Sequence, residues 1–366
     1  MKPSPHHPMK STEGMVDYDR NSAAQQQMVN TQSGRMRELV GSLSPAGPEM
    51  TVVDYGCGPG SSAIEAVRPS IEASRAHFPE LPVSVVHMDQ PGNDWNALFQ
   101  LVFGSFGYRG GSDDIRTAAA VGTFYSQMMP ASSVDMATCF AASHWLSQTV
   151  SVKAPGSIWF ADLQGEARQT VWDQAVRDWS TLLRHRATEI RKGGYLLVGT
   201  LGSVPDETEI NGTAASGRGI YRAIQVVAQS MAEDGLINPD VLDRFVFALW
   251  FMTEEEARTP LEEDGQLAAA FDIEEISVTP APGNNRDVFG AYLADPDDYA
   301  KRYRGYIRAF ADSTLRKQLF EPGVSSVADV DALADTFFNR LEELYRTQTD
   351  KYAFELWHLL VILKKK

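Results

Sequence analysis

The chain has 366 residues, of which 43% are hydrophobic and 22% are charged, which is typical of a globular protein with one large core plus insertions, or two tightly packed units. Its formal net charge is −15, and the one cluster of basic residues is the lysine run at residues 364–366. Both features disfavour a nucleic-acid partner, because binding to phosphates needs clustered Lys and Arg. Two cysteines, no apolar stretch that could span a bilayer and no apolar signal-peptide core predict a cytoplasmic protein without disulfides or membrane contact.

The first half of the chain alternates between strands and helices. Residues 1–14 are rich in Pro, His and Ser and are expected to be a disordered tail. We predict strands at residues 52–55, 83–88, 134–140 and 195–201, and helices at 61–77, 93–103 and 170–191. Gly193 and Gly194 are expected to stop the last of these helices. This alternation predicts an α/β fold, with a mostly parallel sheet covered by helices on both faces.

The second half is mainly helical, with two late strands. We predict helices at residues 220–236, 242–259, 299–310 and 327–346, and strands at 271–278 and 354–363. The expected division is a core of residues 15–204, 266–298 and 348–366 with inserted helices at 205–265 and 299–347. Helices inserted between late strands would form a cap over the carboxyl edge of the sheet.

A glycine-rich turn follows the first predicted strand. Residues 54–60 read Asp-Tyr-Gly-Cys-Gly-Pro-Gly, so Gly56 and Gly58 let the backbone approach a ligand at the start of a helix. A dinucleotide fingerprint would carry a third glycine where Ser61 stands. The acid Asp54 before alternate glycines matches the variant of this turn that methyltransferases use. An ordinary tight turn between strand and helix is the structural alternative.

A second acid, Asp89, follows the next predicted strand. Parallel strands end at the same edge of a sheet, so a carboxylate there lies where a ribose with two free hydroxyls would bind. Taken alone, Asp89 would be a turn residue; together with the glycine turn it indicates a nucleoside site.

Four stretches together resemble the SABATH family of S-adenosylmethionine-dependent carboxyl and nitrogen methyltransferases. They are residues 18–25, the glycine turn, the segment Asp-Gln-Pro-Gly-Asn-Asp-Trp-Asn at 89–96, and a fourth stretch that runs from the block at 121–125 to the block at 143–148. The resemblance covers most of the chain in order. It implies a Rossmann-like methyltransferase sheet, S-adenosyl-L-methionine as cofactor, S-adenosyl-L-homocysteine as product and a small carboxylic acid as substrate. The family commonly forms dimers, so a homodimer is one option.

The resemblance also implies roles for individual residues. The cofactor site would comprise Tyr18, Ser22, Asp54, Gly56, Gly58, Ser61, Asp89, Gln90, Thr123, Phe124, Cys139 and Phe140. The substrate carboxylate would be held by Gln25, His144 and Trp145, which are also the catalytic residues, with Phe245 and Trp250 in an apolar wall of the cap.

Two features depart from the family pattern. The glycine turn is shorter than in the family, so Ser61 or Ser62 must stand in for an asparagine, and Gln90 replaces an apolar residue. Some members hold a metal through asparagines near the substrate, where Val152 and Val246 stand in this chain. Valine has no donor oxygen, and we therefore expect no metal.

A carboxylic acid is ionised at neutral pH, so its methylation needs alignment and no general base. Gln25 and Trp145 offer neutral N–H donors that can orient one carboxylate oxygen. His144 is ambiguous: it can be a neutral donor, a packed core residue, or a base for a phenol or ring nitrogen. The function indicated is therefore O-methylation of a small, largely apolar acid. The alternatives are methylation of a neutral heterocycle or phenol, a ligand-binding protein without turnover, and a dinucleotide oxidoreductase.

Overall fold

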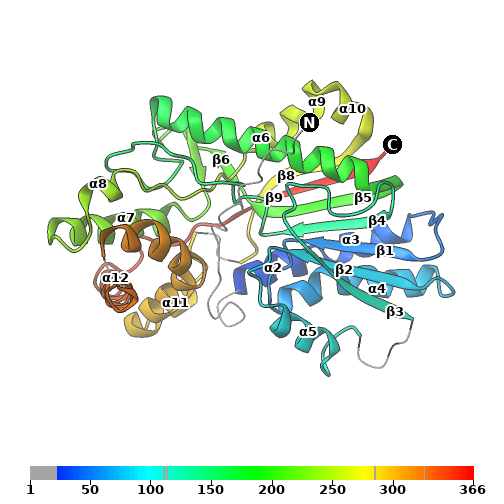
Figure 1. Cartoon of the computed structure of the whole chain (residues 1–366), viewed down its shortest axis with the longest axis horizontal. Helices are drawn as coiled ribbons and strands as arrows, with labels where there is room; N and C mark the ends of the chain where they lie inside the picture. The colour runs from blue at the N-terminus through cyan, green and yellow to red at the C-terminus, as the bar shows by residue number, and fades with distance from the viewer. Residues whose placement is uncertain (1–22, 110–111, 113, 284–285, 325) are drawn as a thin grey trace, which may run out of the picture.

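The computed structural model describes residues 23–109, 112, 114–283, 286–324 and 326–366, and side chains from residue 26 onward (Figure 1). Its strands are β1 (Met50–Tyr55), β2 (Val83–Asp89), β3 (Ile115–Val121), β4 (Val134–Phe140), β5 (Ile190–Leu201), β6 (Ser203–Pro205), β7 (Thr213–Ala215), β8 (Phe271–Pro280) and β9 (Trp357–Lys365). Its helices are α2 (Ala23–Thr31), α3 (Ser33–Gly41), α4 (Ser61–His77), α5 (Trp95–Phe103), α6 (Gly165–Glu189), α7 (Arg218–Glu233), α8 (Pro239–Leu242), α9 (Glu254–Glu263), α10 (Gly265–Ala270), α11 (Pro296–Leu315) and α12 (Val327–Thr347). Shorter helical segments are η1 (Gly290–Tyr292), η2 (Arg316–Phe320) and η3 (Glu321–Gly323).

One 7-stranded sheet forms the centre, in the order β3-β2-β1-β4-β5-β9-β8. Strands β1 to β5 pair in parallel, whereas β9 runs antiparallel to both β5 and β8. The mostly parallel α/β sheet expected from the sequence is therefore confirmed. Because the parallel strands end at one edge, Tyr55, Asp89 and Phe140 close the same side of the sheet.

Helices cover both faces of the sheet, as the burial of the strands requires. Every residue of β1 is buried, and its alternate side chains enter two different cores. Val52 packs in the core formed with α3 and α4, whereas Val53 belongs to the core formed with α6. An apolar strand with no polar face is stable only between two such layers.

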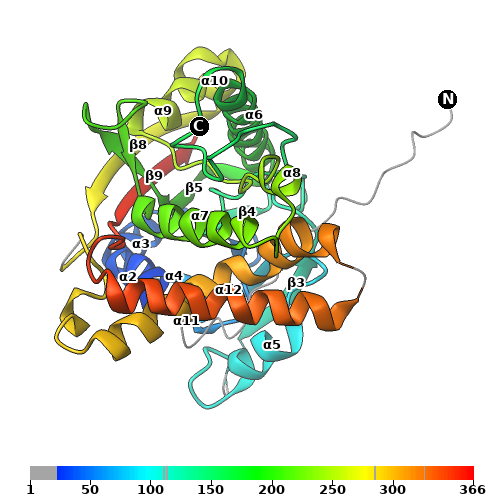
Figure 2. The same ribbon diagram turned by 90° about the vertical axis from the view of Figure 1, so that its left-hand side faces the viewer.

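A group of helices lies beside the sheet. Helices α7, α11 and α12 lie together at the left of Figure 1, and Figure 2 shows them side by side in front of the sheet. Helix α9 lies elsewhere: it contacts α6 and β8 on the sheet itself. Only part of the two inserted stretches therefore lies in this group of helices, namely residues 218–233, 296–315 and 327–347.

Three expectations about secondary structure were wrong or incomplete. Helix α6 ends at Glu189, and Gly193 and Gly194 lie inside β5, where the pairing with β4 is irregular. Strand β3 was not predicted, because this edge strand is rich in Ala and only its first residue, Ile115, is buried. Of the helix expected at 242–259, residues 254–259 belong to α9, whereas residues 245–252 form a buried segment that is not helical. A run of buried aromatic residues carries no periodicity that separates helix from strand.

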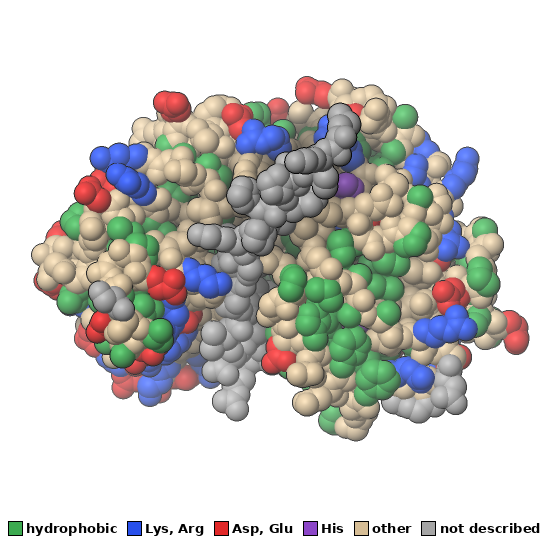
Figure 3. All heavy atoms as spheres, viewed as in Figure 1, with side chains coloured by type: hydrophobic (Ala, Val, Ile, Leu, Met, Phe, Trp, Pro, Cys, Tyr) green, Lys and Arg blue, Asp and Glu red, His purple; other side chains and the backbone are tan. Residues whose placement is uncertain are grey.

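Helix α5 leaves part of its apolar surface uncovered. Phe103 is 58% exposed and the nearby Phe106 is 91% exposed, whereas Leu98 and Val102 face the core. Figure 3 shows hydrophobic side chains gathered over this part of the molecule. Among the described residues, no helix is long and apolar enough to cross a membrane.

Candidate active site

The glycine turn brings the end of β1 close to the chain that follows β4. Gly56 and Gly58 adopt left-handed backbone angles, with φ of 76° and 63°. A Cβ at Gly56 would lie 2.4 Å from Cβ of Ala142 and 3.4 Å from the ring of Phe124. Only glycine combines this conformation with so close an approach. Gly60 is the N-cap of α4 and provides no side-chain cap, so amides of the first turn are available to a ligand.

Asp89 braces this turn from the end of β2. Its carboxylate accepts hydrogen bonds from the backbone N–H of Gly58 at 2.7 Å and of Gln90 at 2.7 Å. Asn93 donates from Nδ2 to the Gly58 carbonyl at 3.2 Å. Burial raises the pKa of Asp89, while these backbone donors oppose the rise. The second predicted acid is thus held in contact with the first predicted motif.

Asp54 is the buried acid of the site. Asp54 is 2% exposed, and its Oδ1 accepts a hydrogen bond from Thr138 Oγ1 at 2.9 Å. Burial raises the pKa of Asp54 to about 7, and the nearby Asp89 adds to the rise. A carboxyl that titrates near neutrality gains from a cationic ligand beside it.

The loop after β3 lies against the same turn. Gly122 N–H donates to the Asp89 carbonyl at 2.9 Å, which continues the pairing of β3 with β2. Thr123 Oγ1 accepts from Tyr125 N–H at 3.2 Å, and the ring of Phe124 reaches Gly56. Phe124 therefore adjoins the glycine turn, and Thr123 precedes it in the same loop. Their role beside the adenine stays a prediction.

Cys139 and Phe140 close β4 at this edge. Burial raises the pKa of the Cys139 thiol to about 12, so the thiol stays neutral and is a packing group. Ser61, at the start of α4, accepts a hydrogen bond at 2.6 Å from Gln26 of α2. The helix that carries the N-terminal sequence block is thereby tied to the glycine turn.

His144 and Trp145 lie just beyond β4, in a loop that is held from several sides. Backbone bonds join His144 O to Trp250 N–H at 3.0 Å and Leu146 N–H to Ala248 O at 2.9 Å. His144 Nδ1 lies 2.8 Å from Thr200 Oγ1. Burial lowers the pKa of His144 to about 3, which keeps the imidazole neutral at physiological pH.

An apolar pocket adjoins this loop, with about 620 Å³ of space that is partly open to solvent. It is lined by Met28, Ala141, His144, Trp145, Leu201, Ser216, Gly217, Ile220, Tyr221, Tyr306, Phe310, Phe354 and Leu356. None of these side chains carries a charge at neutral pH. This lining suits a small apolar ligand with one polar end.

Comparison with known proteins identifies the family. Residues 4–366 match the family described as SAM dependent carboxyl methyltransferase. The chain is 23% identical to S-adenosyl-L-methionine:benzoic acid/salicylic acid carboxyl methyltransferase 2 of Petunia hybrida, covering 98% of this chain and 97% of that protein. It is 24% identical to gibberellic acid methyltransferase 1 of Arabidopsis thaliana, over 80% of this chain and 83% of that protein.

The chain belongs to this family, the SABATH methyltransferases. A solved structure of loganic acid methyltransferase with SAH has the same fold, with a TM-score of 0.74, 21% identity, and coverage of 98% of this chain and 99% of that chain. The sheet is therefore the Rossmann-like methyltransferase sheet that the resemblance implied. The protein is an S-adenosylmethionine-dependent enzyme.

The carboxyl edge fits this methyltransferase cofactor. Gly56 and Gly58 leave the backbone bare where a ligand approaches, and the half-buried Asp89 carboxylate can accept from ribose hydroxyls. Asp54 is a buried acid at the same edge of the sheet. The contacts of Gln90, Ser61 and the other residues with the cofactor stay predictions.

The remaining predicted residues fall into two groups. Tyr18 and Ser22 lie outside the described residues, as does the side chain of Gln25. Phe245 and Trp250 are buried but do not line the pocket of the methyltransferase. Trp250 instead donates from Nε1 to Glu256 at 3.2 Å.

The aromatic wall of the pocket comes from residues that the sequence did not single out. Tyr221 of α7, Tyr306 and Phe310 of α11, and Phe354 before β9 supply it. Their spacing within helices is that of ordinary core residues, so no local pattern distinguishes them. They meet only because α7 and α11 pack together beside β9.

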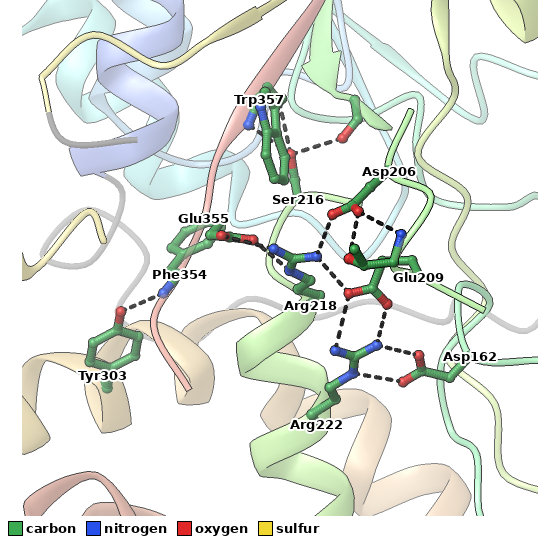
Figure 4. Close-up of polar contacts among 12 residues, drawn as sticks. Asp162, Asp206, Glu209, Ser216, Arg218, Arg222, Tyr303, Phe354, Glu355 and Trp357 are labelled. Carbon is green, nitrogen blue, oxygen red and sulfur yellow. Dashed lines mark hydrogen bonds and ion pairs between the residues drawn. The ribbon is translucent and has the colours of Figure 1, made fainter. Parts of the chain in front are cut away.

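A polar network fixes this wall to the core (Figure 4). Arg218 at the start of α7 pairs with Glu355 at 2.6 Å and with Glu209 at 2.6 Å. Arg222, one turn later, pairs with Asp162 at 2.8 Å, and the Phe354 N–H donates to Tyr303 Oη at 2.6 Å. The network therefore orients α7, which presents Tyr221, and the segment before β9, which presents Phe354.

Proposed function

We propose that the enzyme transfers a methyl group to the carboxylate of a small, largely apolar acid and forms its methyl ester. The observation that carries this proposal is the pocket itself. Its wall is aliphatic and aromatic, and its neutral nitrogen side chains, His144 and Trp145, lie together in one loop beside the cofactor edge. A substrate with a single carboxylate and an apolar body complements such a wall.

Catalysis in this site is positioning. Bound S-adenosylmethionine supplies a methyl group on a positively charged sulfur. The substrate carboxylate is already ionised, so the protein has only to hold one oxygen in line with that methyl group. Trp145 lines the pocket, and we propose that its indole N–H donates to the substrate, with Gln25 as a second donor.

His144 acts in this proposal as a neutral wall or donor. Burial lowers its pKa to about 3, and an imidazole with so low a pKa is a weak base. This does not support the alternative acceptors, a phenol or a neutral heterocycle, because both must lose a proton.

Among the described residues, no group of three or more His, Cys, Asp or Glu side chains could hold a metal ion.

We also propose that helices α7, α11 and α12 form the cap over the substrate, as part of the division into core and inserted helices. Two of these helices supply pocket residues, namely Tyr221 and Tyr306. A homodimer and a cytoplasmic location stay predictions from the sequence.

A methyl-transfer screen tests the proposed reaction. Labelled S-adenosylmethionine is offered with aromatic, indolic and fatty acids, and with phenols and heterocycles of similar size. Label is expected in acids, as base-labile methyl esters. Transfer to phenols or heterocycles alone would contradict the proposal.

Substitution of Trp145 tests the grip on the carboxylate. Trp145→Phe should lower kcat/KM for the acid about 10- to 100-fold, since a hydrogen bond to a charged group contributes roughly 1.5–3 kcal/mol. The control is Trp179→Phe, because Trp179 is also buried and donates to Ala257 O at 3.0 Å outside the pocket. Equal losses in both variants would argue against the role of Trp145.

A further inference from the structure

A buried ion pair at the end of α6 has contacts that stability alone does not explain. The side chains of Arg186 and Glu189 are 1% and 0% exposed, and their atoms Nε and Oε2 lie 2.8 Å apart. Tyr55 donates from Oη to Glu189 Oε2 at 2.5 Å, and the Arg186 guanidinium lies 3.9 Å from the centre of the Tyr55 ring. Burying two charges is costly, and an apolar pair often gives equal stability.

The other hydrogen bonds of Arg186 and Glu189 go to the backbone of one loop, residues 123–129. Arg186 donates from Nη1 to the Phe124 carbonyl at 3.0 Å and from Nη2 to the Ser126 carbonyl at 2.9 Å. Glu189 Oε1 accepts from the N–H groups of Met129, at 3.0 Å, and of Met128. An irregular loop has no neighbouring strand to pair with its backbone N–H and C=O groups. The planar guanidinium and the carboxylate supply the hydrogen-bond partners instead.

This loop touches both halves of the active site. The ring of Phe124 lies against Gly56, on the cofactor side. Tyr125, the next residue, donates from Oη to the carbonyl of Trp145 at 2.5 Å, on the substrate side. A shift of the loop would therefore be felt at both places.

We propose that Arg186 and Glu189 are positioning residues that hold loop 123–129 in its cofactor-binding conformation, and that Tyr125 passes this position on to Trp145. The inference rests on the cofactor site placed at the glycine turn under the proposed function, but not on the identity of the acid. A loop that is already ordered loses less conformational entropy when the ligand binds, so affinity depends on the pair that orders it.

The test is binding of S-adenosylhomocysteine to the full chain by calorimetry, with KM measured separately for S-adenosylmethionine and for the acid. Glu189→Gln and Arg186→Lys should each weaken binding about tenfold and raise KM for the cofactor similarly. Glu189→Gln removes the charge that holds Arg186 and the acceptor for Tyr55, and Arg186→Lys removes donors to the loop carbonyls. Lysine keeps the charge but cannot donate to two carbonyls in one plane.

The matched control is Asp135→Asn. Asp135 is also buried, pairs with Arg191 at 3.2 Å and accepts from Thr51 N–H at 2.8 Å, but it lies near the amino ends of β1 and β4. It should lower Tm while leaving affinity for S-adenosylhomocysteine within about twofold. Equal losses of affinity at equal losses of Tm in Glu189→Gln and Asp135→Asn would overturn the proposal.

Milder variants keep the proposal testable if Glu189→Gln does not fold. Tyr55→Phe removes the hydroxyl that donates to Glu189 and should weaken binding of S-adenosylhomocysteine about threefold.

Tyr125→Phe should raise KM for the acid about threefold with unchanged affinity for S-adenosylhomocysteine. A loss of that affinity with unchanged KM for the acid would contradict the role of Tyr125. A wild-type enzyme that binds S-adenosylhomocysteine but methylates no acid would refute the proposed acceptor and leave these binding tests intact.

Discussion

The proposed cofactor half and the proposed substrate half of this active site are built in different ways. The cofactor half consists of short backbone segments at the ends of neighbouring parallel strands, held together by bonds such as that from Gly58 N–H to Asp89. The substrate half consists of side chains from α2, the loop after β4, α7, α11 and the segment before β9.

The difference teaches which changes each half tolerates. Backbone approach at Gly56 leaves no room for a side chain, so a change there should affect every reaction of the enzyme. The pocket wall presents ends of aromatic side chains, and their replacement should change which acid fits while the cofactor binds as before.

Gly56→Ala is the strongest test of the first half. The new methyl group would lie 2.4 Å from Cβ of Ala142, so the turn or the loop after β4 must shift. We expect affinity for S-adenosylhomocysteine, measured by calorimetry, to fall about 100-fold or more.

Gly156→Ala separates the clash from the backbone strain. Gly156 has φ of 78°, close to the 76° of Gly56, but nothing lies within 4 Å of its added Cβ. Both variants bear the left-handed strain of roughly 1–2 kcal/mol, and only Gly56→Ala should lose binding. If the two variants bind equally well, close backbone approach is not what makes the turn a cofactor site.

Phe310→Ala tests the second half. Loss of the ring enlarges the pocket beside Tyr221 and Tyr306, so kcat/KM for a bulkier acid relative to a smaller one should rise about tenfold. Affinity for S-adenosylhomocysteine should not change. Phe245→Ala is the matched control, since Phe245 is buried outside the pocket and should leave the ratio unaltered. A change in the ratio for Phe245→Ala alone would place the specificity wall elsewhere.

The same contrast explains what could be predicted from the sequence. Strand β1 and the turn are consecutive in the chain, Asp89 ends the next strand, and each carries its own local signal. Glycines in a strand-to-helix turn and an acid at a strand end have physical meanings that need no tertiary information. Helix α4 was predicted with its observed bounds, because apolar spacing and the preceding Gly60 mark it locally.

The substrate wall could not be predicted in this way. The aromatic run at 245–251 was expected to line the pocket, yet it is an extended core segment that pairs with the loop after β4 through Trp145 and Leu249. Tyr306 and Phe310 follow the spacing of a core-facing helix. Whether such a residue faces core or cavity depends on how α7 and α11 pack, and this packing joins residues far apart in the chain.

The last and smallest expected effect concerns His144, which lies where the two halves meet. Because burial lowers its pKa to about 3, below the usual value near 6.5, the folded protein binds no proton there above about pH 4. The unfolded chain binds one below about pH 6.5, so His144 lowers stability progressively as pH falls from 6.5 to 3. Between pH 6.5 and 9 the imidazole is mainly neutral in both the folded and the unfolded state.

Activity toward an acid should follow the same logic. We expect kcat/KM to have no limb from His144 between pH 6.5 and 9, and His144→Asn to stay within about threefold of wild type, because the asparagine amide can keep the contact with Thr200. The measurement is a pH profile of both proteins with one acid substrate. A limb near neutral pH that disappears in His144→Asn would show that the imidazole takes a proton during the reaction, and methylation of a phenol or ring nitrogen would then be the better account of this pocket.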